Sequence, residues 1–325
     1  MPGRHRPRGT MMGAAAIVLW SSSVAFIRTL SEGLGPFSMV AFTYLLAGAL
    51  TLSAAHLAPG GLGRLRHLPR RYLWGCGVPF VAYTASYCLA VGLAADRRQV
   101  LEVGLINYLW PSLTLLLSLP IQRHRGRWFL IPGMLAATAG VVIATAQTGG
   151  FSPSGLLANA SANGLPYGLA LAGAITWALY SNLARRWGGQ AGGVPIFLVA
   201  SGLVVLPLRF VFGESSAWEP RVIAEFVYMA LFVTGAAYIF WDHAMRRGDM
   251  VLVAALSYFT PLLSTLFSAA YLGVVPGPAI WVACVLVIVG ALTCRRAVTE
   301  GDAVSDPPEV LSPTPSGRES SRRRE

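Results

Sequence analysis

Ten apolar segments follow one another through this chain of 325 residues, with little polar sequence between them. A segment of about 20 apolar residues is long enough to cross the hydrocarbon core of a bilayer as a helix. A backbone in lipid must satisfy its own hydrogen bonds, so such segments fold as helices. The segments lie near 12–30, 36–58, 70–94, 98–120, 128–146, 165–186, 193–212, 221–246, 250–272 and 277–296. The pattern predicts an all-α polytopic membrane protein with ten transmembrane helices.

The composition excludes an ordinary soluble enzyme. Only 12% of the residues are charged and the mean hydropathy is +0.57, whereas soluble domains carry about 25% charged residues. Three arginines precede the first apolar segment, as in a signal peptide, but nine more segments follow it. We therefore expect that segment to stay as the first helix. Residues 297–325, rich in proline, serine and charge, predict a disordered tail.

The arginines predict the orientation in the membrane. The net charge is +11, and the chain contains arginine but no lysine. The arginines form short clusters between apolar segments rather than a nucleic-acid-binding face. With ten spans, 20 arginines lie on one side and five on the other. Positive charge marks the cytoplasmic side. We expect a multi-pass protein of a bacterial plasma membrane, with both termini, including basic residues 1–11, in the cytoplasm and no nucleic acid partner.

Several chemistries lack their usual residues. The four cysteines lie in or beside apolar segments without a C-x-x-C pair, so we expect neither a metal site nor a disulfide framework. No cofactor is expected, and no phosphate-binding glycine-rich loop indicates direct use of ATP. Acid, base or metal constellations of a membrane-embedded enzyme are also missing. A channel or a membrane subunit stays open as an alternative, and the sequence leaves the oligomeric state open, a monomer included.

An internal repeat divides the chain into two units of five helices. Ile106–Pro111 resembles Leu256–Pro261 at an offset of 150 residues, and Ala139–Val141 resembles Val289–Ala291 at the same offset. Because five is an odd number, the second unit enters the membrane upside down. The predicted units are 12–146 and 165–296, joined by an extracytoplasmic linker at 147–164. Inverted repeats enclosing a central cavity are typical of transporters.

Three segments carry a resemblance to a known family: Trp20–Ser23, Leu105–Leu115 and Trp177–Arg186. With the repeat, they resemble the EamA-type branch of the drug/metabolite transporter superfamily, and Leu105–Leu115 is similar to the YddG-like aromatic amino-acid exporters. The resemblance covers roughly residues 12–296. It implies a cavity formed mostly by the first, third, fourth, sixth, eighth and ninth segments, with the fifth and tenth peripheral. It also implies export of phenylalanine, tyrosine, tryptophan and related small molecules by alternating access.

Aromatic residues deep in the segments are the candidate cavity wall. Tryptophan usually collects at the membrane interface, yet three tryptophans lie well inside their segments, and several tyrosines share a helical face with another ring. The candidates are Trp20, Tyr83, Tyr87, Trp110, Trp177, Tyr180, Tyr238 and Trp241. Such rings stack on an aromatic ligand or hold an organic cation, so a broad-specificity drug or cation exporter is the alternative. Each ring can instead pack against lipid or another helix.

Two prolines predict interrupted helices. Pro111 and Pro261 cannot donate to the carbonyls four residues earlier, those of Asn107 and Ser257. Freed carbonyls beside a cavity can accept hydrogen bonds from a substrate ammonium group; a plain kink is the alternative. We expect the region of Asn107 to bind the amino-acid head group, Ser257 to lie in the same site, and the two prolines to serve gating.

Ionisable residues inside the segments are few. Glu102 and Glu225 are expected to reach water near the outer ends of their segments. Asp242 and His243 lie about a turn from Arg246, which favours an interfacial ion pair. Since histidine titrates near neutral pH, a role of Asp242 and His243 in proton coupling or gating is the alternative.

Overall fold

The computed structural model is almost entirely helical and describes residues 7–58, 61–149, 153–188, 192–272 and 277–299. Its elements are α1 (Pro7–Ser22), α2 (Val24–Leu34), α3 (Pro36–Leu57), α4 (Gly63–Arg66), α5 (Arg70–Gly92), α6 (Arg97–Asn107), α7 (Trp110–Gln122), β1 (Arg125–Gly126), α8 (Leu130–Gly149), α9 (Pro153–Ala162), α10 (Leu165–Trp187), α11 (Val194–Val211), α12 (Pro220–Tyr228), the π-helix η1 (Met229–Ala236), α13 (Ala237–Arg247), α14 (Met250–Leu256), α15 (Phe259–Leu272), α16 (Pro278–Ala297) and β2 (Val298–Thr299). Most of the predicted tail, 300–325, lies outside the described residues.

Each apolar segment is helical, and several helices begin where the sequence predicts. Helices α3, α11 and α16 have proline at their first or second position, where its missing N–H breaks no helical hydrogen bond. Four segments are interrupted: α1 and α2 separate at Ser23, α6 breaks from α7, α14 breaks from α15, and η1 lies between α12 and α13. The linker prediction missed the short helix α9.

The described residues include six helices, or continuous helical stretches, long and apolar enough to cross a membrane. A seventh is added if the bent pair α14–α15 forms one span. The chain is therefore polytopic, but the count of ten spans is not confirmed by length and hydropathy. Helix α1 has 16 residues, too few for a full span. Helix α10 buries Tyr180, Ser181 and Asn182, and such polar residues lower the hydropathy of a central helix.

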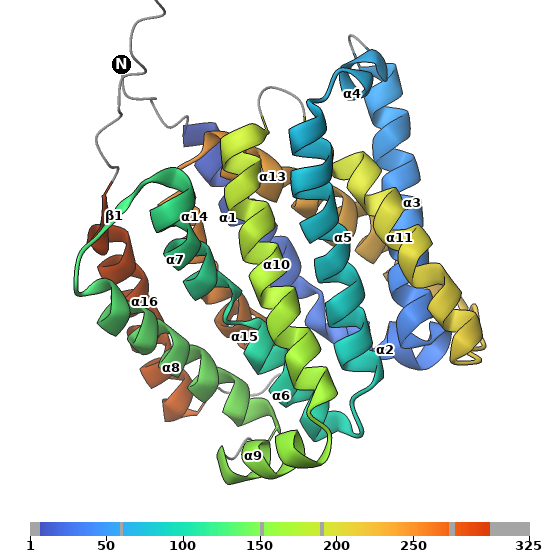
Figure 1. The fold of residues 1–325 in the computed structure, drawn as a ribbon. Helices are drawn as coiled ribbons and strands as arrows, with labels where there is room; N and C mark the ends of the chain where they lie inside the picture. The colour runs from blue at the N-terminus through green and yellow to red at the C-terminus, as the bar shows by residue number, and fades with distance from the viewer. Residues whose placement is uncertain (1–6, 59–60, 150–152, 189–191, 273–276, 300–325) are drawn as a thin grey trace, which may run out of the picture.

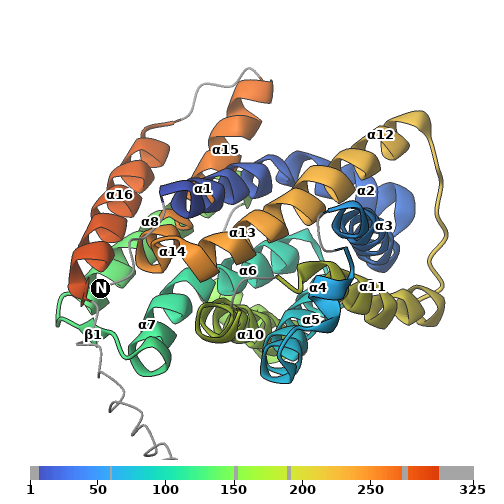
Figure 2. The same cartoon turned by 90° about the horizontal axis from the view of Figure 1, so that it is seen from above.

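The helices pack in pairs across the bundle. Helix α8 packs along α16 at one edge and α3 packs along α11 at the other, while the pairs α5–α10 and α1–α13 lie between them. In Figures 1 and 2, α8 and α16 lie at the left edge, the peripheral place that the resemblance implies for the fifth and tenth segments. A Cβ at Gly290 would meet the backbone nitrogen of Ala137 at 2.5 Å, so glycine permits this close packing.

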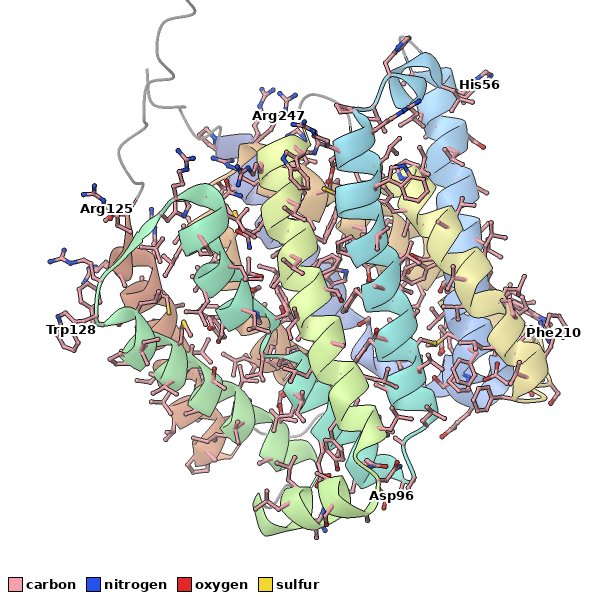
Figure 3. All side chains as sticks on the ribbon, in the orientation of Figure 1. His56, Asp96, Arg125, Trp128, Phe210 and Arg247 are labelled. Carbon is pink, nitrogen blue, oxygen red and sulfur yellow. The ribbon has the colours of Figure 1, made fainter. Side chains whose placement is uncertain are left out.

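One end of the bundle gathers the arginine-rich loops, and we call it the basic end. There the backbone N–H of Asp249 donates to Thr10 Oγ1 at 3.0 Å, and β1 pairs with β2 in antiparallel fashion. The Arg185 guanidinium donates to the carbonyl oxygen of Gly248 at 3.0 Å. Arg125 and Arg247 lie toward this end in Figure 3, opposite Asp96 and Phe210. The sequence predicts that these loops lie on one side of the membrane, and in the structure they lie together at one end of the bundle.

At the opposite end, which we call the distal end, an acidic side chain caps helix α3. The Glu214 carboxylate accepts hydrogen bonds from the backbone N–H groups of Phe37 and Ser38 at 2.9 and 2.7 Å, at the first turn of α3. A carboxylate stabilises the positive N-terminal end of a helix. Gly35, with φ of 87°, makes the turn before α3, and a Cβ there would meet the Glu214 carboxyl carbon at 2.4 Å.

Candidate central cavity

A cavity of about 310 Å³ lies among the central helices. It is lined by residues of α1–α3, α5–α7, α10, η1, α13 and α15, and among its described lining residues there is no Asp, Glu, Lys, Arg or His. Helix α3 of the second segment also contributes, through residues such as Met39, Thr43 and Tyr44, beside the segments that the resemblance implies as the main wall. The wall is mostly apolar, and its polar side-chain groups are hydroxyls, indole N–H groups, one thiol and one amide.

Seven of the ten predicted substrate-binding residues line this cavity, namely Trp20, Tyr83, Tyr87, Asn107, Trp110, Trp177 and Tyr238. They come from six elements far apart in the sequence, and the fold brings them together around one volume. The other three, Tyr180, Trp241 and Ser257, are fully buried and are absent from the lining. A residue must line the cavity to contact a solute inside it, and these three residues do not line it in this conformation.

Trp177 on α10 lies at the centre of the aromatic wall. Its ring centroid lies 4.8 Å from that of Tyr83, 5.6 Å from that of Tyr238 and 5.8 Å from that of Trp20. Most of these rings meet at steep angles, the edge-to-face geometry that aromatic pairs prefer. Because the rings support one another and Trp177 is buried, the wall presents a fixed aromatic surface to the cavity.

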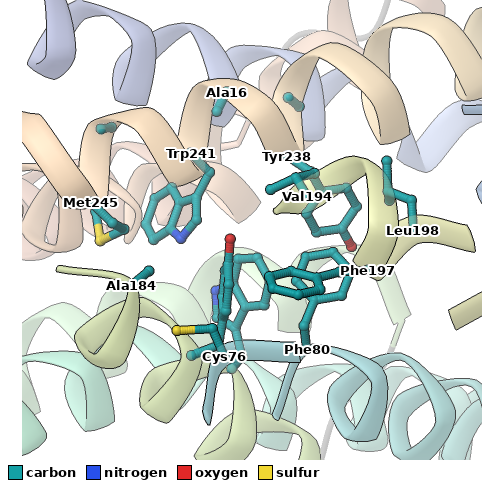
Figure 4. Close-up of a cluster of buried hydrophobic side chains, with 14 of the residues drawn as sticks. Ala16, Cys76, Phe80, Ala184, Val194, Phe197, Leu198, Tyr238, Trp241 and Met245 are labelled. Carbon is teal, nitrogen blue, oxygen red and sulfur yellow. The ribbon is translucent and has the colours of Figure 1, made fainter. Parts of the chain in front are cut away.

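A second aromatic layer separates the cavity from the basic end. Trp241 lies one turn beyond Tyr238 on α13, and its ring contacts Trp20 and Trp110 at centroid distances of 5.3 and 5.2 Å. The indole N–H of Trp241 donates to Ser181 Oγ at 3.1 Å. Figure 4 shows Trp241 and Tyr238 facing Phe80 and Cys76 across the bundle. The layer therefore blocks this side of the cavity.

A buried ion pair lies on the side of this layer that faces the basic end. Asp242 accepts hydrogen bonds from the Tyr180 hydroxyl at 3.0 Å, the Tyr72 hydroxyl at 3.2 Å and Arg246 Nε at 2.7 Å. The side chains of Asp242 and Arg246 are 2% and 7% exposed. The predicted ion pair exists, and it is buried because tyrosines of α5 and α10 cover it. His243 is half-buried and is absent from the cavity lining.

The hydroxyl of Tyr72 extends this network to the loop before α11. It accepts a hydrogen bond from the backbone N–H of Gly193 at 2.8 Å while it donates to Asp242. Helices α5, α10 and α13 thus meet at the Asp242 carboxylate, and Tyr72 connects the loop before α11 to it. A charged group that ties α5, α10, α13 and the α11 loop together holds this end of the bundle closed.

Both predicted proline interruptions are present. Helix α6 ends at Asn107 and α7 begins at Trp110, while α14 ends at Leu256 and α15 begins at Phe259, with the second pair bent by 41°. Pro111 and Pro261 each lie just past the break. The prediction that Ser257 presents a freed carbonyl is wrong, because this carbonyl accepts the backbone N–H of Thr260 at 3.1 Å. The turn satisfies the group that proline releases.

The two glutamates expected to reach water are buried. Glu102 is 1% exposed and its carboxylate accepts hydrogen bonds from the hydroxyl of Tyr167 and from Asn159 Nδ2. Glu225 is 9% exposed and accepts from Arg221 Nε at 2.8 Å. In both cases neighbouring side chains cover the carboxylate, a tertiary effect that the sequence pattern does not contain.

Sequence reasoning missed Tyr44 and Thr260, which also line the cavity. The Tyr44 hydroxyl lies 2.5 Å from that of Tyr238 and joins α3 to α13. Tyr44 lies well inside the segment 36–58, the same signal that selected the deep tryptophans. Thr260 directly precedes Pro261 at the second helix break, and this position beside the proline is the one signal in the sequence that could have identified it as a cavity residue.

The cavity extends from the aromatic wall toward the distal end. Its lining includes Pro36 at the first turn of α3, Val91 at the last turn of α5 and Val100 in the first turn of α6. All three belong to the helix ends opposite the basic end (Figures 1 and 3). The conformation is therefore closed at the basic end and reaches toward the distal end.

Known proteins resemble the chain over most of its length. The Salmonella typhimurium protein named aromatic amino acid exporter YddG is 35% identical, over 89% of this chain and 97% of that protein. Proteins of the same name from Escherichia coli and Ancylobacter novellus are each 32% identical, over 91% and 88% of this chain and 99% and 96% of their own lengths. One crystal structure matches with a TM-score of 0.74 and 29% identity, over 88% of this chain and 96% of that one.

The sequence model of the EamA-like transporter family matches residues 165–295, which run from α10 to α16. The full-length relatives extend the similarity to the first half of the chain. These relatives are exporters rather than enzymes. The chain belongs to the EamA-like transporter family, among relatives that are named aromatic amino acid exporters.

Proposed function

We propose that this protein exports phenylalanine, tyrosine and tryptophan from the bacterial cytoplasm by alternating access. The observation that carries the proposal is the uncharged cavity walled by Trp20, Trp110 and Trp177. Aromatic contacts of this kind contribute about 0.5–1.5 kcal/mol each beyond burial of surface. The names of the full-length relatives support the same class of cargo.

We further propose that the two five-helix units are inverted repeats related by an axis in the membrane plane. Exchanging the units turns the contact of α5 with α10 into that of α13 with α1, and the contact of α11 with α5 into that of α3 with η1; both members of each pair occur. The pairs α3–α11 and α8–α16 exchange with themselves. Such a repeat supplies the two related conformations that alternating access needs.

The basic end is, in this proposal, the cytoplasmic end, because positive charge marks that side. The conformation then opens away from the cytoplasm. Tyr180 and Trp241 become parts of a cytoplasmic gate instead of the substrate site, with Asp242 as its latch. Pro111 and Pro261 provide bends about which the central helices move. The exporter binds its cargo after this gate opens.

An exporter of organic cations with the same fold is the competing function. Aromatic faces do attract cations, and the cavity has several. A buried cation also needs a counter-charge, and the described lining residues include no carboxylate. The charge of the cavity therefore favours a solute without net charge over a drug cation.

Efflux of labelled phenylalanine from preloaded cells tests the proposal, with Asn107→Leu as the variant. Asn107 is the side-chain amide of the cavity wall. We expect Asn107→Leu to reach the membrane normally and to lose most of the efflux. Ser161→Leu is the control, because Ser161 is exposed on α9 and lies outside the cavity lining, and it should export as the unaltered protein does. Unchanged efflux by Asn107→Leu contradicts the assigned site.

A further inference from the structure

Two side-chain oxygens in the cavity wall are buried without a hydrogen-bond partner among the described residues. They are Asn107 Oδ1 and Thr260 Oγ1, and each residue is 6% exposed. Buried polar groups in folded proteins are almost always paired, because an unpaired one loses its bonds to water without replacement. Among the described residues seven buried side-chain atoms lack a partner, and these two are the ones whose residues line the cavity, where a ligand can supply it.

Two other threonines of the wall show how Thr260 differs from a threonine inside a regular helix. Thr43 Oγ1 donates to the carbonyl of Met39 at 2.7 Å, and Thr84 Oγ1 donates to the carbonyl of Phe80 at 3.1 Å. Both residues lie inside regular helices, where the carbonyl four residues earlier is within reach. Thr260 lies at the start of α15, directly after the break, and has no regular preceding turn.

Asn107 and Thr260 also share their place in the fold. Asn107 is the last residue of α6 and Thr260 the second of α15, so each lies at one of the two helix breaks. An amide carbonyl oxygen accepts only, and a hydroxyl both accepts and donates. Two acceptors at one cavity fit a donor with several N–H groups, as in an ammonium ion.

The rest of the wall restricts the net charge of the ligand. No carboxylate is among the described lining residues, so an amine without its own anion would be buried uncompensated; no arginine or histidine is there to pair with a lone carboxylate. A zwitterion carries both charges on adjacent groups. Tyr83 and Tyr87 also line the cavity, and a tyrosine hydroxyl can donate to its carboxylate.

We propose that Asn107 and Thr260 together bind the α-ammonium group of the cargo, and that the uncharged cavity selects aromatic solutes of zero net charge. The inference rests on the proposed export function and adds a second residue and a charge rule to it. The aromatic rings hold the side chain, and the two helix breaks hold the head group.

Three phenyl compounds separate the contributions: phenylalanine with both charges, phenethylamine with only the ammonium group, and 3-phenylpropionate with only the carboxylate. Binding to the purified protein is followed by tryptophan fluorescence, which does not depend on transport. The unaltered protein should bind phenylalanine at least about tenfold more tightly than either analogue, the order of a lost hydrogen bond to a charged group. Equal binding of phenethylamine overturns the charge rule.

Thr260→Val removes the hydroxyl and keeps the shape. We expect binding of phenylalanine and phenethylamine to weaken about tenfold, with 3-phenylpropionate unchanged. Thr265→Val is the control, since Thr265 lies on the same helix, is absent from the lining and bonds its hydroxyl to the carbonyl of Pro261 at 2.9 Å. Unchanged phenylalanine binding by Thr260→Val overturns the assignment of this residue.

A second variant protects the test against a folding failure of the first. Asn107→Asp adds a negative charge to the cavity, so phenethylamine should gain at least about tenfold in affinity relative to phenylalanine. An unaltered ranking of the three compounds contradicts the proposed role of Asn107. Failure of the export function itself shows differently: phenylalanine then binds the unaltered protein but is not transported.

Discussion

Replacing Asp242 with asparagine should open the layer between the cavity and the basic end. Asn keeps the size of the side chain but removes the charge that pairs with Arg246 at 2.7 Å. The two hydroxyls of Tyr72 and Tyr180 that point at Asp242 also lose an ionic acceptor. The two tyrosine bonds join α5 and α10 to α13 and belong to the closed conformation. Arg246 lies on the same helix as Asp242, so it stays beside residue 242 when the gate opens, but opening exposes its charge to water.

The size of the effect follows from burial. The two side chains are 2% and 7% exposed, so solvent hardly screens the pair. Removing one partner of a buried pair costs about 3–5 kcal/mol, because the other charge stays buried without compensation. At about 1.4 kcal/mol for each factor of ten, the ratio of open to closed gate should rise at least about a hundredfold.

Cys76 is a natural reporter of this opening. It is fully buried, one turn from Phe80 on α5 and across the bundle from Trp241 (Figure 4). In a variant whose other three cysteines are replaced by serine or alanine, a membrane-impermeant thiol reagent is applied from the basic end. Asp242→Asn should raise the labelling rate of Cys76 by one to two orders of magnitude, about the population shift derived above.

Asp249→Asn is the matched control at the same end of the bundle. Asp249 pairs with Arg295 at 3.8 Å, with the side chains 25% and 51% exposed. Exposed pairs contribute about 0–1 kcal/mol, and Asn caps a helix as well as Asp does. Labelling should therefore stay near that of the unaltered protein. If Asp242→Asn also leaves Cys76 unreactive, the ion pair is not a latch and the reasoning is refuted.

Two further predictions concern the cavity wall and the helix breaks. Trp177→Phe keeps a ring but loses contact area, so phenylalanine affinity measured by fluorescence should fall by about 0.5–1.5 kcal/mol. Trp128 is 82% exposed in the loop before α8, so Trp128→Phe should leave the affinity unchanged. Equal affinity in Trp177→Phe and the unaltered protein would exclude direct stacking on Trp177. Ser112 and Tyr258 share a 2.5 Å hydrogen bond between the two broken helices. Ser112→Ala and Tyr258→Phe should each lower stability in thermal unfolding by about 1–3 kcal/mol, and the double variant by less than the sum; additive losses would show that the bond is absent.

Much of the fold is predictable because the bilayer constrains it so strongly. Segment length and apolar content locate the helices, as in α3 and α10, and proline marks the breaks beside Asn107 and Ser257. The arginine clusters correctly group the loops of the basic end. These signals are local, or they count residues over a whole segment.

The remaining features depend on how helices rotate against one another. Periodicity places Trp177 and Tyr180 on one face of α10, yet only Trp177 reaches the cavity, while Tyr180 bonds Asp242. The same one-turn step separates Tyr238 from Trp241. The burial of Glu102 depends on Tyr167, a partner from another helix. Such long-range partners cannot be derived from the spacing within one segment.

Counterflow of labelled phenylalanine into liposomes that hold the purified protein tests the central claim most directly. Vesicles loaded with unlabelled phenylalanine should accumulate the label transiently and saturably, and tryptophan or tyrosine outside should block the uptake. Vesicles loaded with a charged organic amine should not support it. Uptake that never saturates, or that the amine supports as well as phenylalanine does, would contradict a carrier whose aromatic, uncharged cavity chooses the cargo.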